Sequence, residues 1–283
     1  MKVSAGFFDS ESHRKLSAKI GSLTILGLQL FFSLSFVSAV ALAQGGPPLI
    51  TDDPDTPGPG YWEINLSSLL EKSSSERRLE APFADINYGV GKRIQLKFEI
   101  PWLNVRQNGN RNQSGPGNSN FGVKWRFLGQ EGKRIAWSIY PQLEVNTKHS
   151  VAERGLVDEG RQFLFPTEVT LEMGRFEFNG EVGRNFVQKG ESGWIYGLAT
   201  EVEFHPHFEL LGEVHGERSG NGPADIIVNV GGRPKITRQI VLLIAAGRTV
   251  QRPPGESPFF RLYFGLQFNL PGQYNFNPNP AHP

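Results

Sequence analysis

The chain has 283 residues, of which 38% are hydrophobic and 20% are charged, and its mean hydropathy is −0.33. This composition excludes a helical membrane bundle, but it suits a soluble protein and also a transmembrane β-barrel, in which only alternate strand residues face lipid. The formal net charge of +1 provides no basic excess for nucleic-acid binding. The absence of cysteine excludes a disulfide framework, a Cys-ligated zinc site and a Cys nucleophile.

The first 43 residues contain the three parts of a secretory signal peptide. A polar, basic region precedes the apolar stretch 20–43, which ends in Ala41-Leu42-Ala43. The alternative interpretation is a transmembrane anchor, because the apolar stretch is long enough to span a bilayer. The A-x-A site, the polar residues inside the stretch and the Gly-Pro sequence after it favour cleavage. We therefore expect residues 1–43 to be removed on export through the secretory pathway, leaving Gln44–Pro283.

The rest of the chain repeats segments of about ten residues in which apolar and polar side chains alternate. In 94–102, for example, Leu96, Phe98 and Ile100 alternate with Lys97 and Glu99. A period of two places these two sets on opposite faces of a β-strand. Twelve strands are expected in chain order, near 62–71, 81–89, 94–102, 121–127, 137–145, 165–173, 176–182, 194–204, 208–217, 224–232, 239–249 and 258–270.

The connections between these segments alternate in length. Short turns are expected at 89–92, 129–133, 174–175, 205–207 and 231–235, and longer polar loops at 106–118, 146–162, 188–193 and 217–223. Short turns on one rim and long loops on the other are typical of outer-membrane barrels. A soluble β-sandwich would show the same alternation. Aromatic residues near the ends of the apolar faces, and the many ionisable residues on the polar faces, favour the barrel.

The predicted fold is therefore all-β, a transmembrane antiparallel up-and-down β-barrel of about twelve strands. The barrel is expected to span 61–270, between a periplasmic N-terminal segment, 44–60, and an Asn/Pro-rich tail, 271–283. A barrel of this kind belongs in the bacterial outer membrane, where lipids surround it.

Two parts of the chain also resemble a known family. The run Pro47–Pro54 leads into Gly60–Asn65, and Asp85–Val90 is followed by Arg93–Leu96. Both resemble the outer-membrane family labelled "putative MetA-pathway of phenol degradation". The resemblance implies an outer-membrane barrel with a poorly defined role in the uptake of small or aromatic compounds.

The same resemblance suggests a role for the acidic segment. It implies that Thr51, Asp52, Asp53 and Pro54 fold into the periplasmic mouth as a small plug. From the residues alone, this stretch is a Pro/Gly-rich turn with Asx capping. A calcium loop is the other alternative, but the EF-hand spacing and its terminal Glu are absent.

The last predicted strand carries a recognition pattern. Tyr263–Leu270 resembles the signal that the barrel-assembly machinery reads. Such signals usually end the chain, whereas here Pro271–Pro283 follows. The barrel-assembly machinery is therefore an expected partner, together with outer-membrane lipids.

The polar faces of the predicted strands carry many more acidic than basic residues. One interpretation is a solvated lumen in which charges pair across strands. The other is a charge-segregated pore, basic on one wall and acidic elsewhere, that favours cations. The expected lumen-lining residues are Lys97, Glu99, Lys124, Arg126, Glu144, Glu168, Glu172, Glu177, Glu181, Glu201, Glu203, Glu209 and Glu213.

Three histidines are candidates for chemistry. His205 and His207 flank a proline in a tight turn, whereas His215 should face the lumen near the opposite rim. Metal ligands must converge within about 2 Å of one ion, so no metal site is expected. A dyad of His215 with Ser219 would suit a lipid-modifying enzyme, but no nucleophile motif or cofactor fingerprint is present.

The sequence thus predicts a non-enzymatic channel or transporter without a cofactor. Its solutes are expected to be small, including aromatic or other small organic compounds, and its lumen charged and acid-rich. The alternatives are an outer-membrane barrel with a structural or adhesive role and, less favoured, an outer-membrane lipid-modifying enzyme. No nucleic-acid partner is expected.

Overall fold

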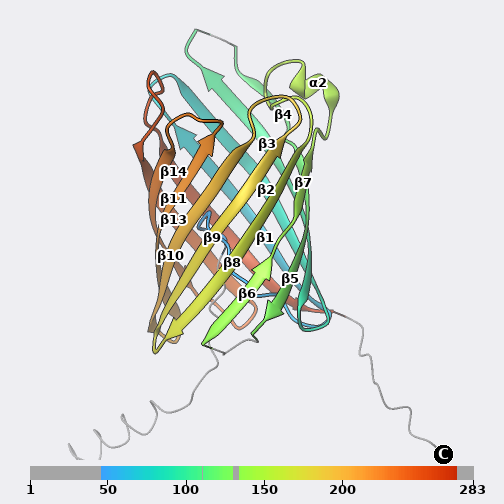
Figure 1. The fold of residues 1–283 in the computed structure, drawn as a ribbon, viewed down its shortest axis with the longest axis vertical. Coiled ribbons are helices and arrows are strands. Elements are labelled where there is room, and N and C mark those ends of the chain that lie inside the picture. The colour runs from blue at the N-terminus through green and yellow to red at the C-terminus, as the bar shows by residue number, and fades with distance from the viewer. Residues whose placement is uncertain (1–45, 110, 130–133, 273–283) are drawn as a thin grey trace, which may run out of the picture. The chain divides into compact units, whose positions relative to one another are not determined.

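A computed structural model describes residues 46–109, 111–129 and 134–272. Antiparallel strands close into a barrel (Figure 1). The strands are β1 (Tyr61–Lys72), β2 (Glu76–Val90), β3 (Ile94–Gln107), β4 (Gln113–Pro116), β5 (Ser119–Leu128), β6 (Ile135–Ile139), β7 (Gln142–Val145), β8 (Gln162–Met173), β9 (Phe176–Val187), β10 (Gly193–His205), β11 (Phe208–Ser219), β12 (Asp225–Pro234), β13 (Ile240–Gln251) and β14 (Phe260–Pro271). The predicted signal peptide and most of the predicted tail lie outside the described residues.

The barrel has twelve positions around its circumference. β4 and β5 share one position because both pair with β3, and β6 and β7 share another because both pair with β8. The barrel is closed by β1 and β14, from Tyr61 opposite Pro271 to Lys72 opposite Phe260. Among the described residues, each of the long strands thus has a partner on both sides, as a membrane-spanning sheet requires. The predicted twelve-stranded antiparallel barrel is confirmed.

The alternation along each strand sorts side chains between the two faces of the wall. Outward apolar residues are exposed, such as Leu66 at 49% and Phe264 at 55%. Inward polar residues are buried, such as Asn65 at 0% and Glu168 at 0%. This is the reverse of a soluble core, so the β-sandwich alternative is wrong. A closed wall with an apolar outer surface and a polar interior is built for lipid, which places the chain in the bacterial outer membrane.

Aromatic side chains mark one edge of the apolar outer surface. Trp62 lies 4.5 Å from Tyr88 between ring centroids, and Phe127 lies 5.5 Å from Trp137. All four lie near the ends of their strands on the rim where β1 begins and β14 ends. Such rings favour the interface between lipid and water. We call this the periplasmic rim, because its turns are short.

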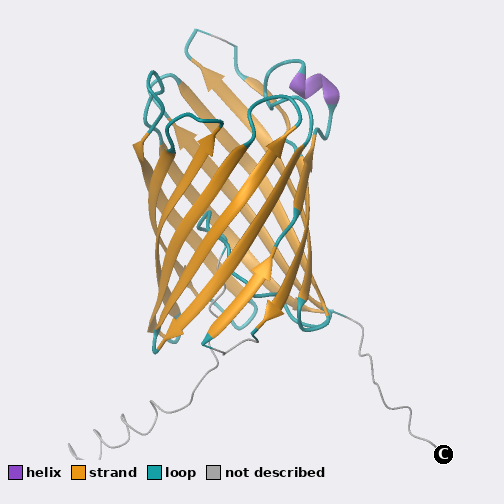
Figure 2. Cartoon of the chain, viewed as in Figure 1, coloured by secondary structure: helices purple, strands orange, loops and turns teal. Residues whose placement is uncertain are grey.

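The opposite rim carries the longer connections (Figures 1 and 2). The longest, 146–161, contains the short helix α2 (His149–Ala152). Val151 and Leu156 from this loop pack against the inward-facing Leu103 of β3. The loop thus folds against the inner wall of the extracellular half of the barrel. In the part of the chain that the structure describes, no helix is long and apolar enough to cross a membrane.

Candidate functional site

The chain between residues 46 and 60 runs through the interior of the barrel before it enters β1. We call these residues the inner segment; Figure 2 shows them as a loop between the strands. Local bonds hold the segment compact, because Leu49 N donates to Gly46 O at 3.0 Å and Asp55 N donates to Asp53 Oδ1 at 2.7 Å. The second of these is an Asx turn, the geometry that the sequence suggested.

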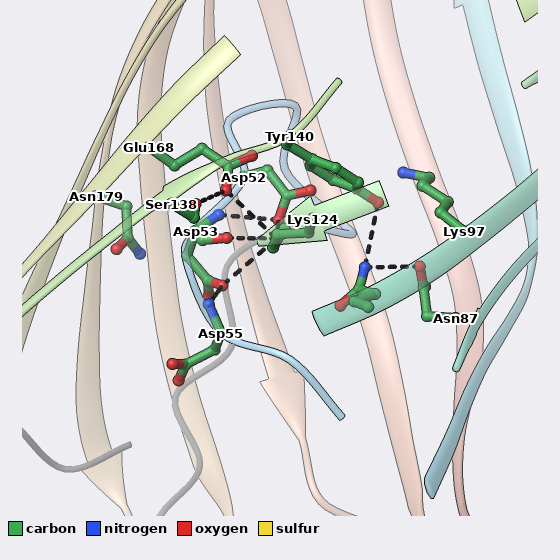
Figure 3. A network of polar contacts seen from close by, with 12 residues as sticks. Asp52, Asp53, Asp55, Asn87, Lys97, Lys124, Ser138, Tyr140, Glu168 and Asn179 are labelled. Carbon is green, nitrogen blue, oxygen red and sulfur yellow. Dashed lines mark hydrogen bonds and ion pairs between the residues drawn. The ribbon is translucent and has the colours of Figure 1, made fainter. Parts of the chain in front are cut away.

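The acidic side of the inner segment faces a basic wall on β5. Lys124 Nζ lies 2.9 Å from Asp52 Oδ1 and donates to the backbone oxygen of Asp53 (Figure 3). Arg126 forms an ion pair with Asp55 and also donates to Lys92 O at 2.8 Å. Both cations are almost fully buried. Two strand residues thus hold the segment at Asp52, Asp53 and Asp55 through charge-assisted hydrogen bonds.

The backbone of the inner segment faces the opposite, acidic wall. The carboxylate of Glu213 on β11 accepts from Ile50 N at 2.9 Å and from Thr51 N at 2.8 Å. On β12, the guanidinium of Arg233 donates to the carbonyl oxygens of Gly46 and Pro47, at 3.1 Å to each. Polar backbone groups that water would otherwise solvate are therefore satisfied by the barrel wall.

The inner segment also contacts an apolar wall inside the barrel. Leu49 of the inner segment packs in a buried cluster with inward residues of five strands. The wall residues of this cluster are Leu69, Ala199, Leu211, Val241, Leu243, Ala245 and Tyr263. The expectation of a charged lumen was therefore incomplete, because residues 240–246 of β13 are apolar on both faces of the wall.

Little space remains between the inner segment and the wall formed by β1, β2, β3 and β5. The cavity there has a volume of about 20 Å³ and is lined by the segment's aspartates together with Asp85, Lys97 and Lys124. That volume is enough for about one water molecule. At the height along the barrel where the inner segment lies, the segment therefore fills this side of the lumen.

A polar network extends from Lys124 along the inner face of the barrel wall. Lys124 Nζ lies 3.5 Å from Glu168 Oε2, which accepts from Ser138 Oγ at 2.6 Å. The ammonium also lies 4.6 Å from the ring centroid of Tyr140, a cation–π contact. Gln95 Nε2 donates to Tyr140 Oη at 3.1 Å. Figure 3 shows these groups converging on the inner segment from several strands.

The sequence-predicted lumen residues all lie on the inward face of the wall. Most have a charged or polar partner, as in Lys97 with Glu99 at 2.8 Å, and Arg233 with Glu201 at 2.7 Å. Glu172 and Glu203 lie at the periplasmic ends of β8 and β10. The remaining predicted residues are placed on inward positions of β7, β8, β9 and β11: Glu144, Glu168, Glu177, Glu181, Glu209 and Glu213. Whether they line a solute path stays a prediction.

Sequence reasoning missed several residues that build this site. Arg233 was assigned to a turn, but β12 continues to Pro234 and directs Arg233 inward. Lys235 follows it and lies 2.6 Å from Glu209. A signal was present, because Asn229, Gly231 and Arg233 continue the two-residue period. For Tyr140 the alternation with Ser138 and Gln142 indicated the polar, inward face, but nothing local identified its contact with Lys124.

The extracellular half of the lumen holds a larger cavity of about 640 Å³. Its lining includes loop residues Gly155–Asp158, and six carboxylates against the single base Arg78: Glu71, Glu80, Glu99, Glu144, Asp158 and Glu217. At the rim above, Glu159 accepts from Lys189 Nζ at 2.6 Å, which lowers the pKa of Glu159 and ties two loops together. The lining of the outer cavity thus carries more acidic than basic side chains, with Glu71 paired to Arg261 at 2.7 Å and Glu99 to Lys97 at 2.8 Å.

The three candidate histidines do not come together. His205 and His207 are exposed on the periplasmic turn with ring centroids 5.6 Å apart, whereas His215 is buried on the inward face of β11. Among the described residues, no group of three His, Cys, Asp or Glu side chains is arranged to hold a metal ion.

Comparisons with known proteins show a similarity of fold. No family model matches the chain, and no curated protein matches it. Among solved structures, the COG4313 outer membrane channel from Pseudomonas putida F1 superposes with a TM-score of 0.61 at 11% identity, covering 80% of this chain and 100% of that one. The NanC porin gives a TM-score of 0.51 at 8% identity, covering 73% of this chain and 100% of that one. At these identities the likeness establishes the barrel fold that this chain shares with outer-membrane channels.

Proposed function

We propose that this protein is an outer-membrane channel for small solutes, closed by its own inner segment. The observation that carries the proposal is the occupation of the lumen by residues 46–60. The basic wall holds the segment's aspartates, and the acidic wall holds its backbone, with room for about one water molecule beside it. A barrel with only a structural role would not need a separate segment that makes complementary polar contacts with two walls of the lumen.

The proposed solutes are small organic compounds with an apolar part. The apolar wall around Leu211, Leu243 and Tyr263 supports this, because a purely aqueous ion channel needs no such surface. The resemblance of Pro47–Pro54 to the phenol-degradation family points the same way. If Leu49 moved away from this apolar wall, the wall would be exposed to a solute in the lumen.

The proposed charge preference is for cations or for solutes with a positive end. The support is the lining of the outer cavity, where six carboxylates outnumber the bases: Arg78 lies in the lining, and Arg261 and Lys97 pair with Glu71 and Glu99. In a low-dielectric passage, an excess of one charge concentrates the opposite ion.

The enzyme alternative has little support from the geometry around His215. Four residues along an extended strand separate His215 from Ser219 by about 13 Å, too far for a hydrogen-bonded dyad. His215 also faces the lumen rather than the lipid in which a lipid-modifying enzyme finds its substrate.

The proposal is tested by single-channel recording of Gln44–Pro283, refolded and inserted in a planar bilayer under a salt gradient. The wild type should open rarely, whereas the double variant Lys124→Gln/Arg126→Gln should open frequently, because it lacks the cations that hold the segment. Lys189→Gln, at an exposed rim ion pair, is the matched control and should behave like the wild type. Folding is checked for each variant by heat-modifiable migration on a gel.

The same recordings measure charge preference. A cation-leaning reversal potential should move toward zero in Glu144→Gln, while Glu153→Gln, at the exposed residue that follows helix α2, should leave it unchanged. If folded Lys124→Gln/Arg126→Gln protein inserts and never conducts, the barrel is not a channel closed by this segment.

A further inference from the structure

Thr51 of the inner segment occupies a niche on the wall that we call the Thr51 niche, formed by Glu181, Gly197 and His215. The strand register places Glu181 of β9 and His215 of β11 on either side of Gly197 in β10. A Cβ added at Gly197 would collide with Thr51 Oγ1. Glycine therefore provides the space that lets Thr51 lie between a carboxylate and an imidazole.

Several polar atoms of the niche lack hydrogen-bond partners. Thr51 Oγ1, Glu181 Oε2 and both ring nitrogens of His215 are buried without a hydrogen bond among the described residues. Buried polar atoms are normally paired, and a neutral imidazole buried with both nitrogens unpaired is destabilising. A protonated ring presents two donors, which carboxylates can satisfy.

The charged groups that face the ring are predominantly acidic. Glu217 Oε1 lies 3.7 Å from His215 Nε2, and Glu181 and Glu213 are the next carboxylates. The flanking residues of β10 and β12 are Gly197 and Ile227, which carry no charge. Asp52 of the inner segment and Lys124 also interact electrostatically with Glu181, and Arg261 interacts with Glu217.

The niche is also coupled to the closed state of the segment. Glu213, which accepts from Ile50 N and Thr51 N, is two residues from His215 on the same face of β11. The backbone amide of Asp52 faces the Glu181 carboxylate. Departure of the segment would remove Asp52 and admit water, which screens the remaining carboxylates from the ring.

We propose that His215 is a proton-binding latch, whose imidazolium holds the inner segment in the closed state. This inference rests on the proposed channel function. The closed state surrounds the ring with carboxylates and so binds the proton more tightly than the open, hydrated state. By linkage, the state that binds more protons gains stability as the pH falls. Acidification through the range in which histidine titrates, near pH 6.5, therefore closes the channel.

The first test is the open probability of wild-type Gln44–Pro283 in a planar bilayer between pH 7.5 and pH 5.5. It should fall on the order of fivefold or more, the usual size of coupling between two linked sites. His215→Gln should lose this dependence, because glutamine keeps polar atoms in the niche but takes up no proton. His205→Gln, at the exposed periplasmic turn, is the control and should keep it. Opening of the wild type on acidification, or an unchanged pH response in folded His215→Gln, would overturn the proposal.

A second readout needs no conductance. Thr56 is a buried residue of the inner segment, and the natural chain has no cysteine, so Thr56→Cys introduces a single thiol. Its labelling by a maleimide should slow as the pH falls, after correction for thiolate content with a model thiol, and addition of His215→Gln should abolish the slowing. Failure of Lys124→Gln/Arg126→Gln to conduct at any pH would reject the channel itself. Conduction by that variant, with wild-type labelling and opening independent of pH, would reject only the latch.

Discussion

Individual residues decide how the inner segment lies against the wall. Lys124 and Arg126 bind its aspartates, Glu213 binds its backbone, and Gly197 makes room for Thr51. Each contact joins positions that are at least seventy residues apart in the chain. The segment is therefore specified by the side chains that the closed barrel directs inward, rather than by its own local propensity.

A larger side chain at residue 197 should open the channel. Gly197→Val is compatible with a β-strand, but its branched side chain would occupy the position of Thr51 and displace the segment. We expect more frequent openings in single-channel recordings, without loss of the folded barrel. Gly180→Val on the neighbouring strand is the control, because a Cβ there meets nothing within 4 Å. Equal openings in the two variants would contradict this account of the niche.

At the scale of the elements, the outward face of each strand suits the lipid core at its middle and the interface between lipid and water at its ends. Leu66 lies at the centre of β1 and Val250 near the extracellular end of β13, both exposed and outward. Leu66→Arg should cost about 2–4 kcal/mol of unfolding free energy in lipid, and Val250→Arg roughly 0–1 kcal/mol. Urea unfolding in vesicles measures both, and equal costs would show that the wall does not cross the bilayer as described.

The strands could be predicted where apolar and polar residues alternate along a continuous stretch of sequence. The segment 94–102 alternates without interruption, and β3 contains it in full. β2 was expected from residue 81 but begins at Glu76, because the mostly charged residues 76–80 pair with β3 beyond the apolar zone. The loop expected at 106–118 is shortened for the same reason, since β4 pairs with β3 there.

The site was less predictable than the strands, because its contacts are long-range. The acidic residues Asp52 and Asp53 were recognised, but nothing local identifies Lys124 as their partner. The run 240–246 is apolar throughout, so its inward wall could not be distinguished from its outward one. Closure of the barrel brings that wall against Leu49.

At the scale of the whole molecule, the interior is divided into two levels. The inner segment fills the passage beside the basic wall, and an acidic cavity of about 640 Å³ lies in the extracellular half, beneath loop 146–161. A solute entering from outside would thus first meet carboxylates and then the inner segment. In the proposed channel, movement of the segment is the step required for passage through the lumen.

The most direct test of that step fixes the segment to the wall with a reversible bond. Thr51→Cys with Gly197→Cys should form a disulfide, because a Cβ at residue 197 would lie 3.0 Å from Thr51 Cβ, slightly inside the range of about 3.5–4.5 Å seen in disulfides. The oxidised double variant should insert in a planar bilayer and stay closed, and a reductant should make it conduct, whereas neither single variant should respond to reductant. Conduction of the oxidised protein equal to that of the reduced protein would contradict the claim that the inner segment closes this channel.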